Sequence, residues 1–160
     1  MRHRALPLLL LVACGARTDL GGQREDASAP ATQSPGVVVN ECAPNDGPQV
    51  TFVLPLEGAT LPACPSSLGG QGGFHISFWN PPPSAPGTYA IGDGSFASGS
   101  SATYCPLPPG PCTTADHGTF TLTELTSEAS GHFTVVLPDN TSMSGYFSKI
   151  PVCHNKTLCG

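Results

Sequence analysis

The density of proline and glycine is the feature that most restricts how this chain can fold. Its 160 residues include 18 prolines and 19 glycines. Proline inside a helix removes a backbone hydrogen bond and clashes with the preceding turn, and glycine raises the entropic cost of ordering the chain. No segment keeps apolar residues at the 3.6-residue spacing of an amphipathic helix. The sequence therefore predicts an all-β protein.

Short runs of alternating apolar and polar residues support this prediction. Because successive side chains of a strand point to opposite faces, the run 74–79 places Phe74, Ile76 and Phe78 on one face. His75 and Trp79 then share the other face. The predicted strands are 49–54, 74–79, 87–91, 100–105, 117–125, 131–137 and 143–150, with a turn at 140–142. About seven or eight short strands predict a small antiparallel β-sandwich or barrel.

The N-terminal 14 residues carry the features of an export signal. A basic start, Arg2 to Arg4, precedes an apolar run from Ala5 to Val12. This run has the length of a signal-peptide core, whereas a bilayer span needs about 20 residues. Leu11-Val12-Ala13-Cys14 resembles a bacterial lipobox, although Pro7 departs mildly from the pattern. The alternative is an ordinary secretory signal with a cysteine there by chance.

The lipobox resemblance implies cleavage before Cys14, a diacylglyceryl group on its thiol and a further acyl chain such as palmitate on its amino group. We expect a signal peptide at 1–13, the lipidated Cys14 with a disordered tether at 14–36, and a β domain at 37–160. Gly15, in place of an aspartate retention signal, favours the outer membrane or the cell surface. The segment from Cys14 to Leu20 is similar to the start of myxobacterial-type lipoproteins.

Six cysteines remain once Cys14 is set aside, and an even number is what a set of disulfides requires. They are Cys42, Cys64, Cys105, Cys112, Cys153 and Cys159. Such a set is typical of an oxidising compartment. Local loop closure favours the pairs Cys42–Cys64, Cys105–Cys112 and Cys153–Cys159, although fifteen pairings are open and Cys153 has the alternative of pairing across the sheet. The spacing does not fit structural zinc.

The charge distribution excludes several partners. No lysine or arginine lies between Arg24 and Lys149, and ten acidic residues are spread thinly over that span. Nucleic-acid binding needs clustered basic side chains, so nucleic acid is not an expected partner. Attraction to anionic lipid heads is absent for the same reason. The acyl chains on Cys14 would therefore have to hold the protein at the membrane.

A second resemblance lies in the last third of the chain. Glycine and phenylalanine recur as Gly118-Thr-Phe, Gly131-His-Phe and Gly145-Tyr-Phe, with Pro86-Gly87-Thr88-Tyr89 upstream. This cadence resembles a group of bacterial lipoprotein β domains of unknown function, over roughly residues 86–153. It implies a small β-sandwich or barrel and no particular activity. We expect the glycines at strand starts or bulges, beside core phenylalanines.

No arrangement of catalytic or metal-binding residues stands out. The chain has no Gly-x-Ser-x-Gly elbow, and the segment 92–95 is typical of a turn. The histidines lie far apart in the sequence, and Glu124 and Glu128 flank a predicted turn at 126–130. Asp93 and Asp139 could supply oxygen ligands for calcium but follow no known calcium motif. We therefore expect no enzyme activity, no cofactor and no bound metal.

Three aromatic residues are candidates for a ligand-facing surface: Trp79, Tyr89 and Tyr104. An exposed cluster would suit sugar stacking or a protein contact, whereas packing of Trp79 beneath the proline-rich loop is the simpler interpretation. We expect a lipid-anchored, non-enzymatic structural or interaction module of the cell envelope, with an envelope protein or polysaccharide as partner. A carbohydrate-binding module is the alternative, and a hydrolase with an unrecognised site is a third hypothesis.

Overall fold

The computed structural model describes residues 36–43, 46–56, 59, 61, 64, 72–106 and 110–153. These residues form nine strands and no helix, which confirms the all-β prediction. The strands are β1 (Val37–Cys42), β2 (Pro48–Leu54), β3 (Gly73–Phe78), β4 (Gly87–Ile91), β5 (Ser100–Cys105), β6 (Thr113–Thr114), β7 (His117–Leu125), β8 (Glu128–Val136) and β9 (Ser142–Cys153). The predicted signal peptide, Cys14, residues 15–35 of the predicted tether and Cys159 lie outside the described residues.

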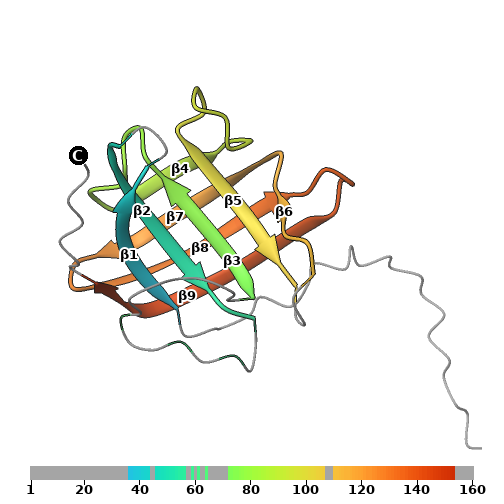
Figure 1. The fold of residues 1–160 in the computed structure, drawn as a ribbon. Helices are drawn as coiled ribbons and strands as arrows, with labels where there is room; N and C mark the ends of the chain where they lie inside the picture. The colour runs from blue at the N-terminus through green and yellow to red at the C-terminus, as the bar shows by residue number, and fades with distance from the viewer. Residues whose placement is uncertain are drawn as a thin grey trace, which may run out of the picture.

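One continuous sheet joins all nine strands, in the order β4-β7-β8-β9-β1-β2-β3-β5-β6. Neighbouring strands are antiparallel except β1 and β9, which pair in parallel. The sheet curls over on itself, so that β4, β7, β8 and β9 form one layer and β1, β2, β3, β5 and β6 cross it as a second layer (Figure 1).

A bulge in β9 lies where the sheet passes from one layer to the other. Two residues of β9, Ser148 and Lys149, oppose the single residue Ser130 of β8, and Lys149 has a left-handed φ of 53°. The Lys149 N–H donates to the Ser130 hydroxyl at 3.0 Å. Such a bulge bends a strand and increases its twist. Beyond it, Val152 and Cys153 pair with β1, so β9 belongs to both layers.

The sequence predictions missed β1, because its side chains do not alternate in polarity. Val37, Val38 and Val39 are all buried. Val38 belongs to the main core, whereas Val37 and Val39 pack with Val53 and Cys153 in a second cluster on the other face of the sheet. A segment buried on both faces reads as a continuous apolar run, as at 37–39, and lacks the period-2 signal. The other strand that was not predicted, β6, has only two residues.

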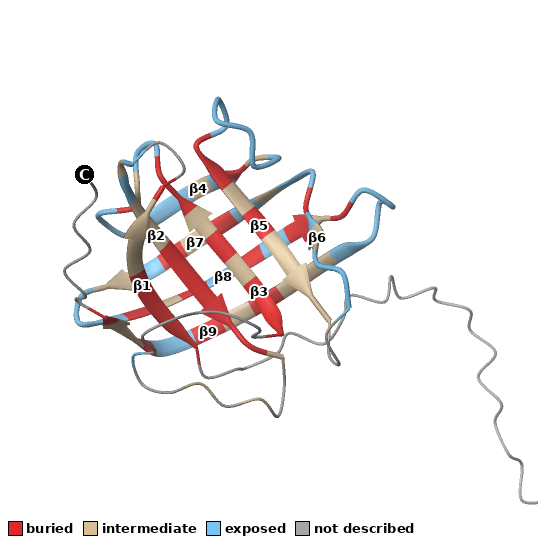
Figure 2. Cartoon of the chain, in the orientation of Figure 1, coloured by how far each residue is buried: buried red, intermediate tan, exposed pale blue. Residues whose placement is uncertain are grey.

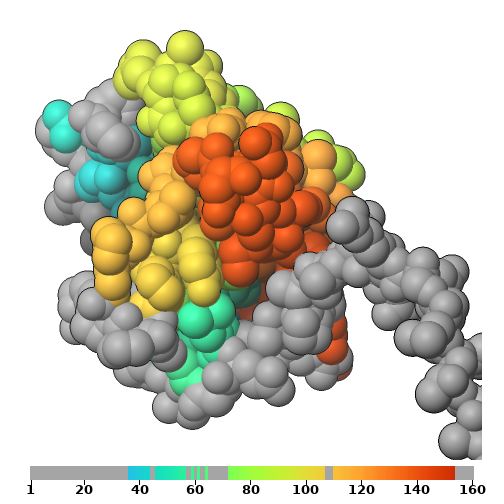
Figure 3. All heavy atoms as spheres, turned by 90° about the vertical axis from the view of Figure 1, so that its right-hand side faces the viewer, coloured from blue at the N-terminus to red at the C-terminus, as the bar shows by residue number. Residues whose placement is uncertain are grey.

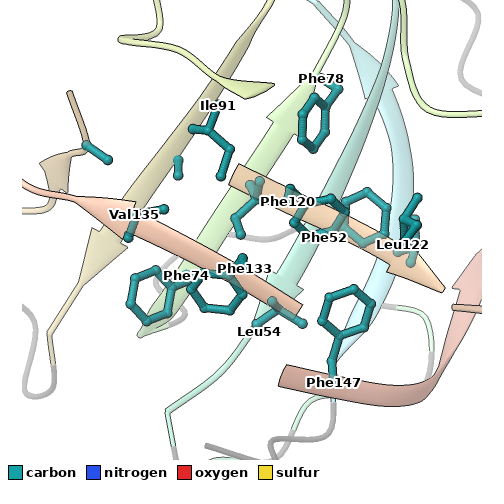
Figure 4. Packing of buried hydrophobic residues seen from close by; sticks show 14 of the residues in the cluster. Phe52, Leu54, Phe74, Phe78, Ile91, Phe120, Leu122, Phe133, Val135 and Phe147 are labelled. Atoms are coloured by element: carbon teal, nitrogen blue, oxygen red, sulfur yellow. The ribbon is translucent and has the colours of Figure 1, made fainter. Parts of the chain in front are cut away.

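Aromatic rings from the two layers meet in the main core (Figure 4). The Phe52 ring of β2 lies 4.5 Å from that of Phe120 on β7 and 5.9 Å from that of Phe147 on β9. Phe74 of β3 reaches Phe133 of β8 at 4.7 Å. Figure 2 shows buried residues along the strands of both layers. These centroid distances are typical of favourable aromatic pairs, which add to the stabilisation from apolar burial.

The repeated Gly-x-Phe pattern reflects how side chains of adjacent strands pack together. Gly131 on β8 lies opposite Phe147 on β9, and Gly145 on β9 lies opposite Phe133 on β8. A methyl group on Gly131 would come within 2.9 Å of the Phe147 ring, and one on Gly145 within 2.7 Å of the Phe133 ring. Gly145 therefore lies mid-strand, where the absence of a side chain leaves room for the opposite ring, and not at a strand start or bulge as predicted.

The disulfides confirm one predicted pair and correct two. Cys105–Cys112 forms as predicted, across a separation of seven residues. Cys64 pairs with Cys153, 89 residues away, so the predicted pairs Cys42–Cys64 and Cys153–Cys159 are wrong. Cys42 is also disulfide-bonded. The local-loop argument failed because the parallel pairing of β9 with β1, which sequence spacing does not reveal, carries Cys153 to the opposite layer.

Gly131→Ala and Gly145→Ala should each destabilise the domain, by about 1–3 kcal/mol, because the new methyl group overlaps neighbouring atoms. At Gly131 it would also lie 2.1 Å from the Thr121 carbonyl oxygen. Gly87→Ala is the matched control, since the nearest atom there is 3.6 Å away. Urea unfolding measures all three variants. Equal stability of the Gly87 and Gly145 variants would contradict the proposed fit of ring against glycine.

Removing the two described disulfides should have unequal effects. In the chain-entropy model the stabilisation grows with the length of the closed loop. For separations of 89 and 7 residues, the double variant Cys64→Ala/Cys153→Ala should lose roughly 2 kcal/mol more than Cys105→Ala/Cys112→Ala. Denaturant unfolding of the two variants under oxidising conditions measures the difference. A larger loss from the Cys105–Cys112 pair would count against this account.

Candidate functional site

Trp79 offers no exposed ring for a ligand. It lies just after β3, is only 9 % exposed, and its backbone N–H donates to the Gly99 carbonyl at 2.8 Å. Its indole Nε1 is buried without a hydrogen-bond partner among the described residues. The sequence raised the possibility of a carbohydrate site built on an exposed Trp79. The fold does not present such a surface, because the Trp79 ring is buried.

The structure places the two candidate tyrosines at opposite ends of the fold. Tyr104 is half-buried on β5, with its ring 5.1 Å from that of Phe74. Tyr89 is half-buried on β4, with its ring 5.9 Å from that of Phe78. Phe74 and Phe78 lie toward opposite ends of β3, so the structure does not bring Tyr104 and Tyr89 together. The Tyr89 hydroxyl donates to the Ala85 carbonyl at 2.5 Å, which fixes its ring.

A pocket of about 230 Å³ opens beside Tyr89, and we refer to it as the mouth pocket. Its lining residues come from the end of β3, from β4 and from the chain entering β5: Phe78, Asn80, Pro81, Tyr89, Ala90, Ser98, Gly99 and Ser100. None of these described residues carries a charge. Tyr89 is half-buried and Asn80 is exposed, whereas Phe78 and Ser100 are each only 3 % exposed. In β-barrels the mouth is a common place for ligand sites.

Strand register places the mouth pocket far from the point where the chain enters the fold. Phe78 pairs with Val50 near the start of β2 and with Ser100 at the start of β5. Val37, the first residue of β1, pairs instead with Val53 at the end of β2. The pocket and the beginning of β1 therefore lie at opposite ends of the layer that contains both.

The loop 92–99 borders the pocket and is held by its own hydrogen bonds. The Ser95 N–H donates to Asp93 Oδ1 at 2.9 Å, and the Ser98 N–H donates to the Ser95 carbonyl at 3.1 Å. The Ser100 hydroxyl accepts from the Gly92 N–H and donates to the Ala90 carbonyl, joining both ends of the loop. The loop, yellow-green, projects from the top of the molecule in Figures 1 and 3.

Phe96 lies in this loop and is 65 % exposed, the one large apolar side chain recorded as exposed among the described residues. Sequence reasoning did not single out Phe96, Asn80 or the serines of the pocket rim. The available signal was a phenylalanine isolated among the small residues of 92–99, which cannot bury it locally. That signal gives no indication of which segments will lie beside it.

The acidic residues considered as ligands or catalysts serve local structure. The Thr141 N–H donates to Asp139 Oδ1 at 2.9 Å, and the Ser130 hydroxyl donates to Glu124 at 3.3 Å. The hydrogen bond from the Ser95 N–H lowers the pKa of Asp93 from the ordinary value of 3.8. The hydrogen bond from the Thr141 N–H lowers the pKa of Asp139 in the same way. Within the described ranges, no three histidine, cysteine, aspartate or glutamate side chains gather as a metal site.

His75 and His132, which share the polar parity of their strands, are not brought together. His75 is half-buried on β3, and His132 is exposed on β8 in the other layer. Glu128 is exposed at the start of β8. In the part of the chain that is described, no helix is long and apolar enough to cross a membrane.

No protein-family model, curated protein or solved structure matches this chain.

Acidification should break the hydrogen bond between the Ser95 N–H and Asp93, within the loop 92–99, only below the ordinary aspartate range. Because the folded pKa of Asp93 is lowered, the bond from the Ser95 N–H is present above the unfolded pKa of about 3.9 and is lost as pH falls through the lower, folded value. Carboxyl-carbon NMR should show Asp93 titrating with the Ser95 amide. In Asp93→Ala the Ser95 amide should no longer follow this titration. An Asp93 pKa at or above 3.8 would contradict the prediction.

Proposed function

We propose that this chain is an exported lipoprotein, anchored through acyl chains on Cys14 at the outer membrane or cell surface, whose β domain is a non-enzymatic interaction module. The observation that carries the proposal is the Cys64–Cys153 disulfide, which joins two distant parts of the fold. Disulfides of this kind persist in oxidising compartments outside the cytoplasm. The lipobox resemblance at 11–14 supplies the route of export and the anchor.

The surface charge supports anchoring by lipid. With no lysine or arginine between Arg24 and Lys149, the domain has no basic patch with which to hold anionic lipid heads. Two or three acyl chains give stable attachment, whereas one chain binds only marginally. The beginning of β1 is the end nearest the anchor in sequence, and the mouth pocket lies at the other end of that layer.

The engagement of polar side chains in structure supports a non-enzymatic role. Besides Asp93, Asp139 and Glu124, Glu41 accepts a hydrogen bond from the Thr51 hydroxyl at 2.8 Å on the second layer. The Ser100 hydroxyl, which lines the pocket, is engaged at both its donor and its acceptor site. These groups hold strands and loops together, and none is paired with a base as a nucleophile would be.

Cys14→Ser should remove the anchor without unfolding the β domain, because position 14 precedes every described residue. In a bacterial host the native chain should fractionate with membranes, and mass spectrometry of its N-terminal peptide should show a diacylglyceryl-modified, acylated Cys14. The variant should be soluble.

Cys105→Ser/Cys112→Ser is the control, since it removes two cysteines of the domain and should stay in the membrane fraction. A native chain in the soluble fraction with no acyl mass on Cys14 would overturn the anchor.

A further inference from the structure

We infer that the mouth pocket and the adjoining Phe96 form a binding site for a neutral sugar ring of a polysaccharide. The inference rests on the proposed export of the domain, because such a polymer would be met outside the cytoplasm. It places recognition on Tyr89, Asn80 and Phe96, and gives no role to Trp79 or Tyr104.

The first support is the chemistry of the pocket. The half-buried Tyr89 ring provides an apolar wall, and the buried Phe78 ring lies behind it at 5.9 Å. The hydrogen bond from the Tyr89 hydroxyl to the Ala85 carbonyl holds the Tyr89 ring in place. Asn80 is exposed at the rim, and its side-chain amide offers both donor and acceptor groups. A pyranose has the matching construction, with apolar C–H faces and hydroxyl groups around its edge.

Charge narrows the class of ligand further. The described lining residues are uncharged, and the domain up to Lys149 contains no lysine or arginine that could pair with a phosphate, sulfate or uronate group. Burying an unpaired charge is strongly unfavourable. An acidic polysaccharide or a phosphorylated ligand is therefore disfavoured relative to a neutral sugar.

Size and the loop define the mode of binding. At about 230 Å³ the pocket is below the roughly 300–1,000 Å³ of sites that enclose drug-sized ligands, so it suits a single ring. Ser98 and Gly99 of the loop 92–99 line the pocket, and Phe96 stands two residues from Ser98. Hydrogen bonds of Ser95 and Ser98 hold the loop on both sides of Phe96, whose ring is left in solvent. In the inferred complex this ring contacts a neighbouring sugar of the same polysaccharide chain.

Saturation-transfer NMR on the full chain carrying Cys14→Ser tests the inference, with maltohexaose, cellohexaose and chitohexaose as neutral probes. We expect transfer from aromatic protons to the ring protons of at least one probe. Phe96→Ser and Tyr89→Leu should each weaken binding by about threefold or more, as expected for loss of one aromatic contact. Because Phe96 is exposed, its variant should keep the native unfolding curve, so loss of binding there cannot be attributed to misfolding.

Tyr146→Leu is the matched control, since Tyr146 is another half-buried tyrosine, on β9 and outside the pocket. Absence of transfer to all three neutral probes would overturn the inference. So would equal weakening by Tyr146→Leu, or binding confined to polygalacturonate or to an extended uncharged peptide. The assay uses unacylated protein, so its failure would leave the anchor untouched, just as loss of acylation would leave sugar binding untouched.

Discussion

The contact of phenylalanine rings between the two layers is the interaction on which the rest of this structure depends. Phe52 alone brings together rings from three other strands, at Phe78, Phe120 and Phe147. A sheet of nine strands reaches this arrangement only if it curls, and the Lys149 bulge turns β9 from one layer toward the other. Gly131 and Gly145 then let the rings of adjacent strands lie close to the backbone. Packing of the phenylalanine rings between the layers thus requires both the curvature of the sheet and glycine at these positions.

The same curl creates the candidate site. Tyr89 of β4 and Phe78 of β3 are far apart in the order of the sheet, yet their rings are 5.9 Å apart because the two ends of the sheet approach each other. The loop 92–99 connects β4 to β5 across that approach and carries Phe96 outward. The pocket lies where these strands approach each other, and its described lining carries no charge.

Alternation in polarity predicted the strands that are buried on one face. The predicted ranges 87–91, 100–105 and 117–125 are the observed β4, β5 and β7. The same signal failed for β1, because Val37, Val38 and Val39 are buried on both faces. It could not place Trp79 either, since parity assigns a side chain to a face and says nothing about what covers that face.

The sequence by itself determined that this chain is all-β, stapled by disulfides and poor in positive charge, and it predicted an export signal ending at Cys14. These properties follow from composition and from local spacing, which act within a few residues. Tertiary structure alone decided that Cys153 meets Cys64, that Tyr89 and Tyr104 are separated, and that Asn80 and Phe96 lie near one pocket. Each of these depends on the pairing of β9 with β1 or on the curl of the sheet. Both are contacts between segments far apart in the chain, and such contacts produce no periodic pattern in the sequence.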